Sequence, residues 1–202
     1  MTQVFLNYRA ADEPLGAGML DQILSERFGS SAVFFASKSI ELGSLWEPEM
    51  FTAVEKSVAV LVVIGRFWLT AADKDGALLL GKEDDFVRRE ILLGMQTGKK
   101  VIPVLLGTPR PKRGELPEAL RPLVERQSIS IAYRSAGPDI DRLVTKLREE
   151  IPELRKLGRK PDALPAQGNT TNVVQNGDGQ QNNYWTGENS TIVNFEAVRR
   201  FR

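Results

Sequence analysis

The sequence predicts an α/β domain in which a parallel sheet of five strands carries helices on both faces. One observation behind this prediction is that short apolar runs alternate with helically spaced patterns over residues 4–151. A second is the run at 58–64, VAVLVVI, which is apolar at every position, as expected of a central parallel strand covered on both faces. Because parallel strands need crossover connections, usually helices, the alternation itself favours a parallel sheet.

The first half of this body contains three predicted strands and two predicted helices. Residues 4–6 (VFL) and 32–36 (AVFFA) are short apolar runs, and residues 58–64 form the long one. Between them, residues 18–28 and 46–57 repeat their apolar side chains at intervals of three and four, which places those side chains on one face of a helix. The predicted order is strand, helix, strand, helix, strand.

The second half adds two strands and three helices. Residues 101–106 (VIPVLL) and 128–132 (SISIA) are predicted strands. Pro103 lacks a backbone N–H, so it argues that the first of these is an edge strand or contains a bulge. The predicted helices are 86–95, 116–124 and 140–151.

Charge and hydropathy limit the classes of partner. The 202 residues include 27 basic and 26 acidic side chains, for a net charge of +1, which gives no overall attraction to nucleic acid or to an anionic membrane. No apolar stretch approaches the roughly 20 residues of a membrane span, and the first residues lack the pattern of a secretion signal. We therefore expect a cytoplasmic protein without nucleic-acid or membrane partners.

Histidine and cysteine are both absent. This excludes Ser-His-Asp and Cys-His catalytic groups, as well as zinc sites that use His or Cys ligands. We expect neither a metal nor a cofactor. Any catalysis has to use carboxylates, hydroxyls, Lys, Arg or backbone groups.

The composition divides the chain into three parts. Residues 1–152 carry the strand and helix patterns, residues 153–168 are a basic linker rich in Pro and Gly, and residues 169–196 are rich in Asn, Gln and Gly. The last part has too few apolar residues to fold alone. We therefore expect one domain followed by an appendage.

A ligand site is expected where the strands of the body end. In open parallel sheets, ligands bind outside the carboxyl ends of the strands. Three segments follow such ends, at residues 7–12, 37–45 and 65–69. The helix that begins near residue 46 starts from the second of them.

Three blocks of sequence resemble TIR domains. VFLNYRAADE (4–13) is similar to their opening strand and loop, and WEPEMFTAVEKSVAVLVVIG (46–65) to their catalytic helix and central strand. DFVRREILLGMQTGKKVIPVLLG (85–107) is similar to a later helix and strand. The resemblance covers about residues 2–150 and implies a flavodoxin-like sheet. It also implies one of two activities: cleavage of NAD+, as the substrate, at the nicotinamide–ribose bond, or non-catalytic scaffolding through TIR–TIR contacts.

The resemblance implies that Glu49 is the catalytic carboxylate and that Trp46 lies beside it. Bacterial members usually space the two residues as Trp-x-x-x-Glu, whereas this chain has Trp-x-x-Glu. Either gap is close to one helical turn. The residues agree with this role, because a first-turn carboxylate is stabilised as an anion by the helix dipole and an anion can stabilise an oxocarbenium-like ribose. The alternative is that Glu49 only starts the helix, as we interpret Glu47.

Substrate contacts are expected from the loops around this helix. The predicted substrate-binding residues are Tyr8, Arg9, Ala10, Ser37, Lys38, Ser39 and Trp46. Arg9 suits a diphosphate or a ribose, and Lys38 begins the loop that TIR domains use for substrate contact and assembly. The alternative for each is that it does not bind substrate: Arg9 is then a surface arginine, and Lys38 a solvated lysine.

The tail suggests recruitment by stacking. The predicted assembly motif is Val173, Val174, Gln175, Asn176 and Gly177. Its last four residues resemble the hydrophobic-Gln-hydrophobic-Gly core of RHIM-type amyloid motifs, although Asn176 replaces an apolar residue. Asn and Gln side chains form ladders when identical segments stack in register. The alternative is a disordered appendage.

Together these features predict a TIR effector that is activated by assembly and hydrolyses NAD+ in immune or cell-death signalling, for example in antiphage defence. The expected partners are other copies of the chain, through the TIR domain, and a sensor with a matching amyloid-type motif. The alternative is an adaptor that assembles without catalysis.

Overall fold

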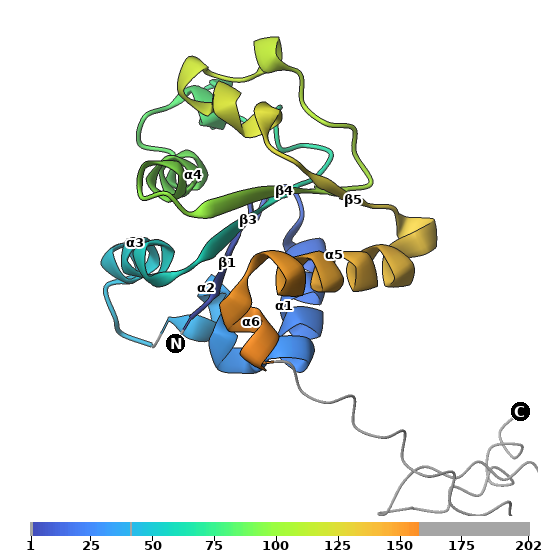
Figure 1. The fold of residues 1–202 in the computed structure, drawn as a ribbon. Coiled ribbons are helices and arrows are strands. Elements are labelled where there is room, and N and C mark those ends of the chain that lie inside the picture. The colour runs from blue at the N-terminus through green and yellow to red at the C-terminus, as the bar shows by residue number, and fades with distance from the viewer. Residues whose placement is uncertain (1, 41, 158–202) are drawn as a thin grey trace, which may run out of the picture. The chain divides into compact units, whose positions relative to one another are not determined.

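The computed structural model describes residues 2–40 and 42–157. One all-parallel sheet has the strand order β2-β1-β3-β4-β5 (Figure 1), which confirms the predicted fold class. The strands are β1 (Val4–Asn7), β2 (Val33–Phe34), β3 (Ala59–Ile64), β4 (Lys100–Leu106) and β5 (Ile129–Ile131). The α-helices are α1 (Pro14–Phe28), α2 (Ala36–Ser39), α3 (Trp46–Lys56), α4 (Phe86–Gln96), α5 (Ala136–Glu150) and α6 (Pro152–Leu157). The 3₁₀ turns are η1 (Ser30–Ala32), η2 (Leu79–Gly81), η3 (Arg113–Glu115), η4 (Glu118–Glu125) and η5 (Tyr133–Ser135).

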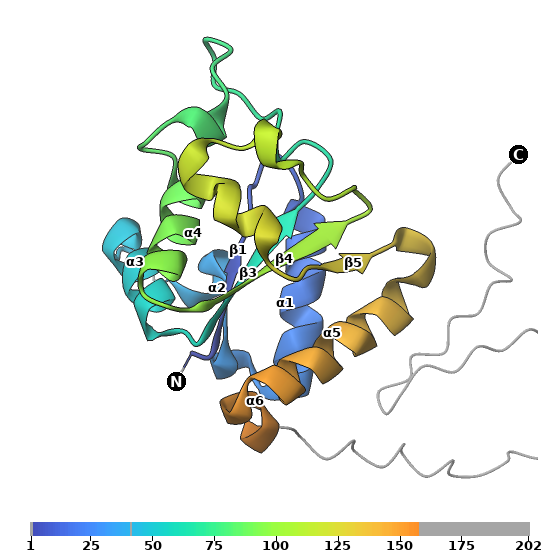
Figure 2. The same cartoon turned by 45° about the horizontal axis from the view of Figure 1, so that its top comes forward.

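Helices cover both faces of the sheet. Figure 1 shows α3 and α4 on one side, and α1, α5 and α6 on the other. In the turned view of Figure 2, α1 and α5 still lie side by side. Two apolar clusters match these two layers, one packed around α1, α5 and α6 and the other around α3, α4 and η4.

The position of strand β3 between two helical layers explains why its sequence is apolar throughout. All six of its residues are buried. Ala59, Leu61 and Val63 belong to the cluster under α1 and α5, whereas the alternate residues of the strand belong to the cluster under α3 and α4. Because successive side chains of a strand point to opposite faces, a sheet covered on both sides leaves no polar position in its central strand.

The prediction that Pro103 marks an edge strand or a bulge is wrong. Strand β4 lies between β3 and β5, and Pro103 pairs in register with Val62 of β3. Gly107 donates its N–H to Ile131 on β5, and by alternation Pro103 turns its nitrogen to the same side. Pairing with β5 begins only at Val104, so the missing N–H falls where no neighbouring strand could accept it.

Two further segments differ from their predicted form. Residues 118–125 form the 3₁₀ turn η4, with Pro122 inside it, where the pattern predicts a helix over 116–124. A proline inside a segment removes one backbone donor and clashes with the preceding turn, which disfavours a regular α-helix there. Residues 153–157, which begin the predicted linker, lie in α6, and Leu154 is buried against the α1–α5 cluster. The packed body therefore extends to Leu157.

Across residues 2–40 and 42–157, no helix has both the length and the hydropathy needed to cross a bilayer.

Candidate functional site

The loops that follow β1 and β3 meet at the carboxyl end of the sheet. Asp12 accepts hydrogen bonds from the backbone N–H groups of Gly65 (2.8 Å) and Phe67 (2.6 Å). Two of the three predicted strand-end segments, 7–12 and 65–69, are thereby joined. Tyr8 of the first segment also stacks on Phe35, which precedes the third segment, with ring centroids 5.0 Å apart.

Asn7, the last residue of β1, ties that strand to α4. It is fully buried, and its side-chain amide donates to the carbonyl oxygen of Val87 (3.1 Å) and to Oε2 of Glu90 (2.6 Å). Glu90 is 2% exposed. Burial raises the pKa of Glu90 to about 8, and the hydrogen bond from Asn7 opposes this rise only in part. A buried carboxyl group therefore contacts the end of β1, next in sequence to the predicted residues Tyr8 and Arg9.

Arg9 is buried in an ion pair. Its two terminal nitrogens each donate to one oxygen of Asp85, both at 2.9 Å, and the side chains are 6% and 7% exposed. Asp85 also accepts a hydrogen bond from the backbone N–H of Arg88 (2.9 Å) as the N-cap of α4. The guanidinium of Arg9 thus joins the loop after β1 to the start of α4.

The first turn of α3 carries two carboxylates with different surroundings. Glu47 accepts a hydrogen bond from Arg89 of α4 at 2.8 Å. The guanidinium of Arg89 also lies over the rings of Phe51 and Phe86, 4.4 and 5.3 Å from their centroids. Trp46 packs edge-on against the same Phe86 ring, with centroids 4.5 Å apart. Glu47 and Trp46 therefore belong to the contact between α3 and α4.

Glu49 lines a groove of about 340 Å³ between α3 and the open edge of the sheet at β2. Within the described part of the chain, its side chain makes no hydrogen bond or ion pair. Ser39, Thr52 and Lys56 line the same groove. Thr52 and Lys56 follow Glu49 at intervals of three and seven, so one face of α3 forms the wall.

The predicted site residues separate into groups. Ser39 shares the groove with Glu49, and its Oγ accepts a hydrogen bond from the backbone N–H of Phe35 (3.1 Å). Lys38 is held by an ion pair with Asp21 and donates to Ser25 (2.7 Å) on α1. Ser37 and Ala10 are exposed. The structure brings Glu49 and Ser39 together, whereas Arg9, Tyr8, Trp46 and Lys38 contact other partners.

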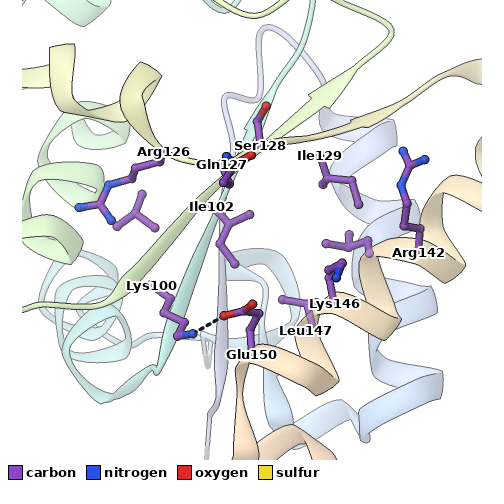
Figure 3. Close-up of a pocket in the computed structure, with 12 residues that line it drawn as sticks. Lys100, Ile102, Arg126, Gln127, Ser128, Ile129, Arg142, Lys146, Leu147 and Glu150 are labelled. Atoms are coloured by element: carbon purple, nitrogen blue, oxygen red, sulfur yellow. Dashed lines mark hydrogen bonds and ion pairs between the residues drawn. The ribbon is translucent and has the colours of Figure 1, made fainter.

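A larger cavity of about 590 Å³ lies at the amino end of the sheet, where β4 and β5 begin (Figure 3). Its floor includes Ile102, Ile129 and Leu147, and Lys100 and Glu150 pair across it at 2.8 Å. None of the predicted site residues lines it.

Sequence reasoning missed Thr52, Lys56, Asp85 and Glu90. The spacing of Thr52 and Lys56 from Glu49 on a predicted helix was the available signal for the groove. For Glu90, the signal was its place on the apolar stripe of α4, between Val87 and Ile91, both buried.

The motif residues 173–177 lie outside the described residues.

The strand order and the two helical layers define a flavodoxin-like α/β domain with a carboxylate-lined groove at one sheet edge. Among solved structures, the fold is that of TIR domains. The TIR domains of the activated Roq1 resistosome, which directly recognises the pathogen effector XopQ, match with a TM-score of 0.56 at 16% identity. The match covers 73% of this chain and 99% of that one.

Two further solved structures are similar at TM-scores of 0.45. One is a metazoan TIR-STING receptor from C. gigas in complex with 2′,3′-cGAMP, at 19% identity over 77% of this chain and 39% of that one. The other is the TIR domain of the Toll-related receptor TRR-2 from Hydra magnipapillata, at 16% identity over 77% and 99%. No protein-family model and no curated protein matches the chain.

Proposed function

We propose that this TIR-fold chain cleaves NAD+ at the nicotinamide–ribose bond, with Glu49 as the catalytic carboxylate. The observation that carries the proposal is the difference between the two carboxylates that begin α3. Arg89 neutralises Glu47, whereas Glu49 lines a groove and has no partner among the described residues. A carboxylate that is not already paired is available to a cation that develops on a substrate.

The chemistry suits a lone carboxylate. Cleavage breaks the bond between the ribose C1′ and the pyridinium nitrogen, and both electrons of that bond leave with the nitrogen as neutral nicotinamide. The ribose gains oxocarbenium character, which the Glu49 anion stabilises. Water then adds to C1′ and loses a proton, which gives ADP-ribose. Because nicotinamide departs neutral, the step needs no strong general acid, and the lack of histidine is no obstacle.

The helix supports the charge state that this role requires. Glu49 lies in the first turn of α3, where the unpaired backbone N–H groups and the helix dipole favour an anion. Lys56 lines the same groove two helical turns further along, about 10 Å by helical rise. We assign it as a candidate ligand for the substrate diphosphate, because Arg9, the predicted ligand, is already paired with Asp85.

Assembly is the proposed switch. Leu42 and Leu45, in the segment before α3, are fully exposed and 78% exposed, and Trp46, which begins α3, is 47% exposed. Exposed apolar residues clustered in sequence are typical of an interaction surface. We propose self-association through this TIR fold, with recruitment by a sensor whose motif matches residues 173–177, in immune or cell-death signalling. The same exposed residues favour the second candidate function, an adaptor that assembles without catalysis.

The two candidates differ in one assay. Concentrated protein, with and without a crowding agent, is incubated with NAD+, and free nicotinamide is measured by chromatography. The enzyme releases nicotinamide at a rate that rises more steeply than protein concentration, because assembly raises the local concentration of domains. An adaptor forms large species by light scattering yet releases none.

A further inference from the structure

The contact between the end of β1 and α4 contains two oxygens without hydrogen-bond donors. They are Oδ1 of Asn7 and Oε1 of Glu90, and both are fully shielded from solvent. They belong to two side chains that already share one hydrogen bond, from Asn7 Nδ2 to Glu90 Oε2 at 2.6 Å. Buried polar atoms in folded proteins nearly always have partners, so this pair requires an explanation. The proposed cleavage of NAD+ does not use Glu90.

Among the described residues, Glu90 has no ion-pair partner. Arg9 faces it from the loop after β1 and lowers its pKa only in part, because both terminal nitrogens of Arg9 are engaged by Asp85. The Nε of Arg9 is also buried and donates to neither of the two oxygens. Asp85, which precedes α4, is itself anionic and opposes a second negative charge nearby. Tyr8 also faces Glu90, and its own pKa is raised by burial and then by Glu90. An ionised Glu90 would therefore be a buried charge with one amide donor, which is costly.

The orientation of the Asn7 amide is fixed independently. Its nitrogen donates to the carbonyl oxygen of Val87 at 3.1 Å, and a carbonyl oxygen can only accept. Asn7 Oδ1 is therefore an acceptor that needs a donor. A proton on Oε1 of Glu90 supplies that donor, and both orphan oxygens then have partners through one added proton.

We propose that Glu90 is kept as a neutral carboxylic acid that forms a two-hydrogen-bond pair with the Asn7 amide, and that it is a positioning residue for the segment bearing Tyr8 and Arg9. The pair holds the end of β1 against α4 and leaves Arg9 to Asp85. Loss of the proton places a second carboxylate beside Asp85, and the two compete for Arg9. The link between this segment and catalysis rests on the proposed cleavage of NAD+.

The protonation state has a thermodynamic consequence with a definite sign. Across the interval from pH 4.5 to about 8, the folded protein holds the Glu90 proton after the unfolded chain has lost it. The stabilisation from this proton is therefore fully present below pH 4.5, decreases as the pH rises and is lost above about 8. Glu90→Gln keeps a neutral partner that can donate to Asn7 and accept from it, so it removes this pH dependence while retaining the pair.

The direct test is a ¹³C NMR titration of the full chain with labelled glutamate side-chain carboxyls, with Glu90→Gln used to assign the Glu90 signal. The expected result is a carboxyl that titrates at about pH 8. The unfolding free energy of the wild type, compared with that of Glu90→Gln, should also fall between pH 4.5 and 8. A Glu90 signal that titrates near the ordinary value of about 4.3 would overturn the proposal.

The positioning role has a separate readout. The rate of NAD+ cleavage by the wild type should fall as the pH rises through about 8, whereas Glu90→Gln should retain its rate to higher pH. If the rate of NAD+ cleavage depends on alkaline pH in the same way in both proteins, the positioning role is contradicted. If neither protein releases nicotinamide at any pH, the proposed function fails, and the NMR titration still decides the state of Glu90.

Discussion

At the scale of single residues, the environment of a charged side chain decides its role more than its identity does. Glu47 and Glu49 are two residues apart on one helix, yet one is paired with Arg89 and the other lines a groove. Glu90 is a third carboxyl group, and its burial shifts the pKa far upward. The three glutamates thus serve as an ion-pair partner, a candidate catalytic anion and a neutral hydrogen-bond donor.

Arg9 gives a prediction at this scale. Because the Arg9–Asp85 pair is buried, Arg9→Ala leaves an uncompensated carboxylate and should lower the free energy of unfolding by about 3–5 kcal/mol. Arg27 is the matched control, since its pair with Asp141 is 48% and 64% exposed; Arg27→Ala should cost about 0–1 kcal/mol. Urea denaturation measures both. Equal, small effects would show that the Arg9 pair is dispensable to the fold.

At the scale of elements, the sequence predicts most of the sheet but few of the contacts between its loops. Apolar runs identify β1 to β4, because burial on both faces demands apolar side chains, whereas β5 is an edge strand with Ser130 exposed. The pairing of Arg9 with Asp85 was not predictable from pattern, because 76 residues separate the two and only the folded chain brings them together. The prediction from Pro103 was wrong for a similar reason. Whether its missing N–H removes a hydrogen bond of the sheet depends on where β5 begins, and the residues of β4 do not encode this.

Helix α6 provides the element-scale prediction. Leu154 is completely buried, so Leu154→Ala should destabilise the protein by about 2–5 kcal/mol. Leu157 in the same helix is 43% exposed, and Leu157→Ala should cost much less. Thermal unfolding of the two variants compares them directly. If Leu154→Ala is as mild as Leu157→Ala, the body ends before α6, at the boundary that the sequence predicts.

At the scale of the whole molecule, the described residues already form both apolar clusters, from members between residues 4 and 154. A chain ending at residue 160 should therefore stay folded, with the unfolding temperature of the full-length protein. Basal NAD+ cleavage at high concentration should survive, since the groove is intact. A truncated chain that aggregates or unfolds would show that the tail contributes to the fold.

The tail itself carries a prediction about recruitment. A peptide of residues 169–196 should form fibrils with a strand spacing of about 4.7 Å, detected by thioflavin fluorescence and fibre diffraction. Val174→Pro with Gln175→Asp should abolish them, because proline removes a ladder donor and a stacked aspartate repeats a like charge. A wild-type peptide that stays monomeric at high concentration, even with seeds, would leave recruitment by stacking without support.

The central claim is that the Glu49 carboxylate cleaves NAD+, and a comparison of two isosteric variants in one nicotinamide-release assay tests it most directly. Glu49→Gln removes only the charge and should lower the rate at least about a hundredfold, or ~2.7 kcal/mol of barrier, with the unfolding temperature unchanged. Glu47→Gln, which loses only its partly exposed pair with Arg89, should stay within a few-fold of the wild type. Full activity in Glu49→Gln together with loss of activity in Glu47→Gln would contradict the assignment.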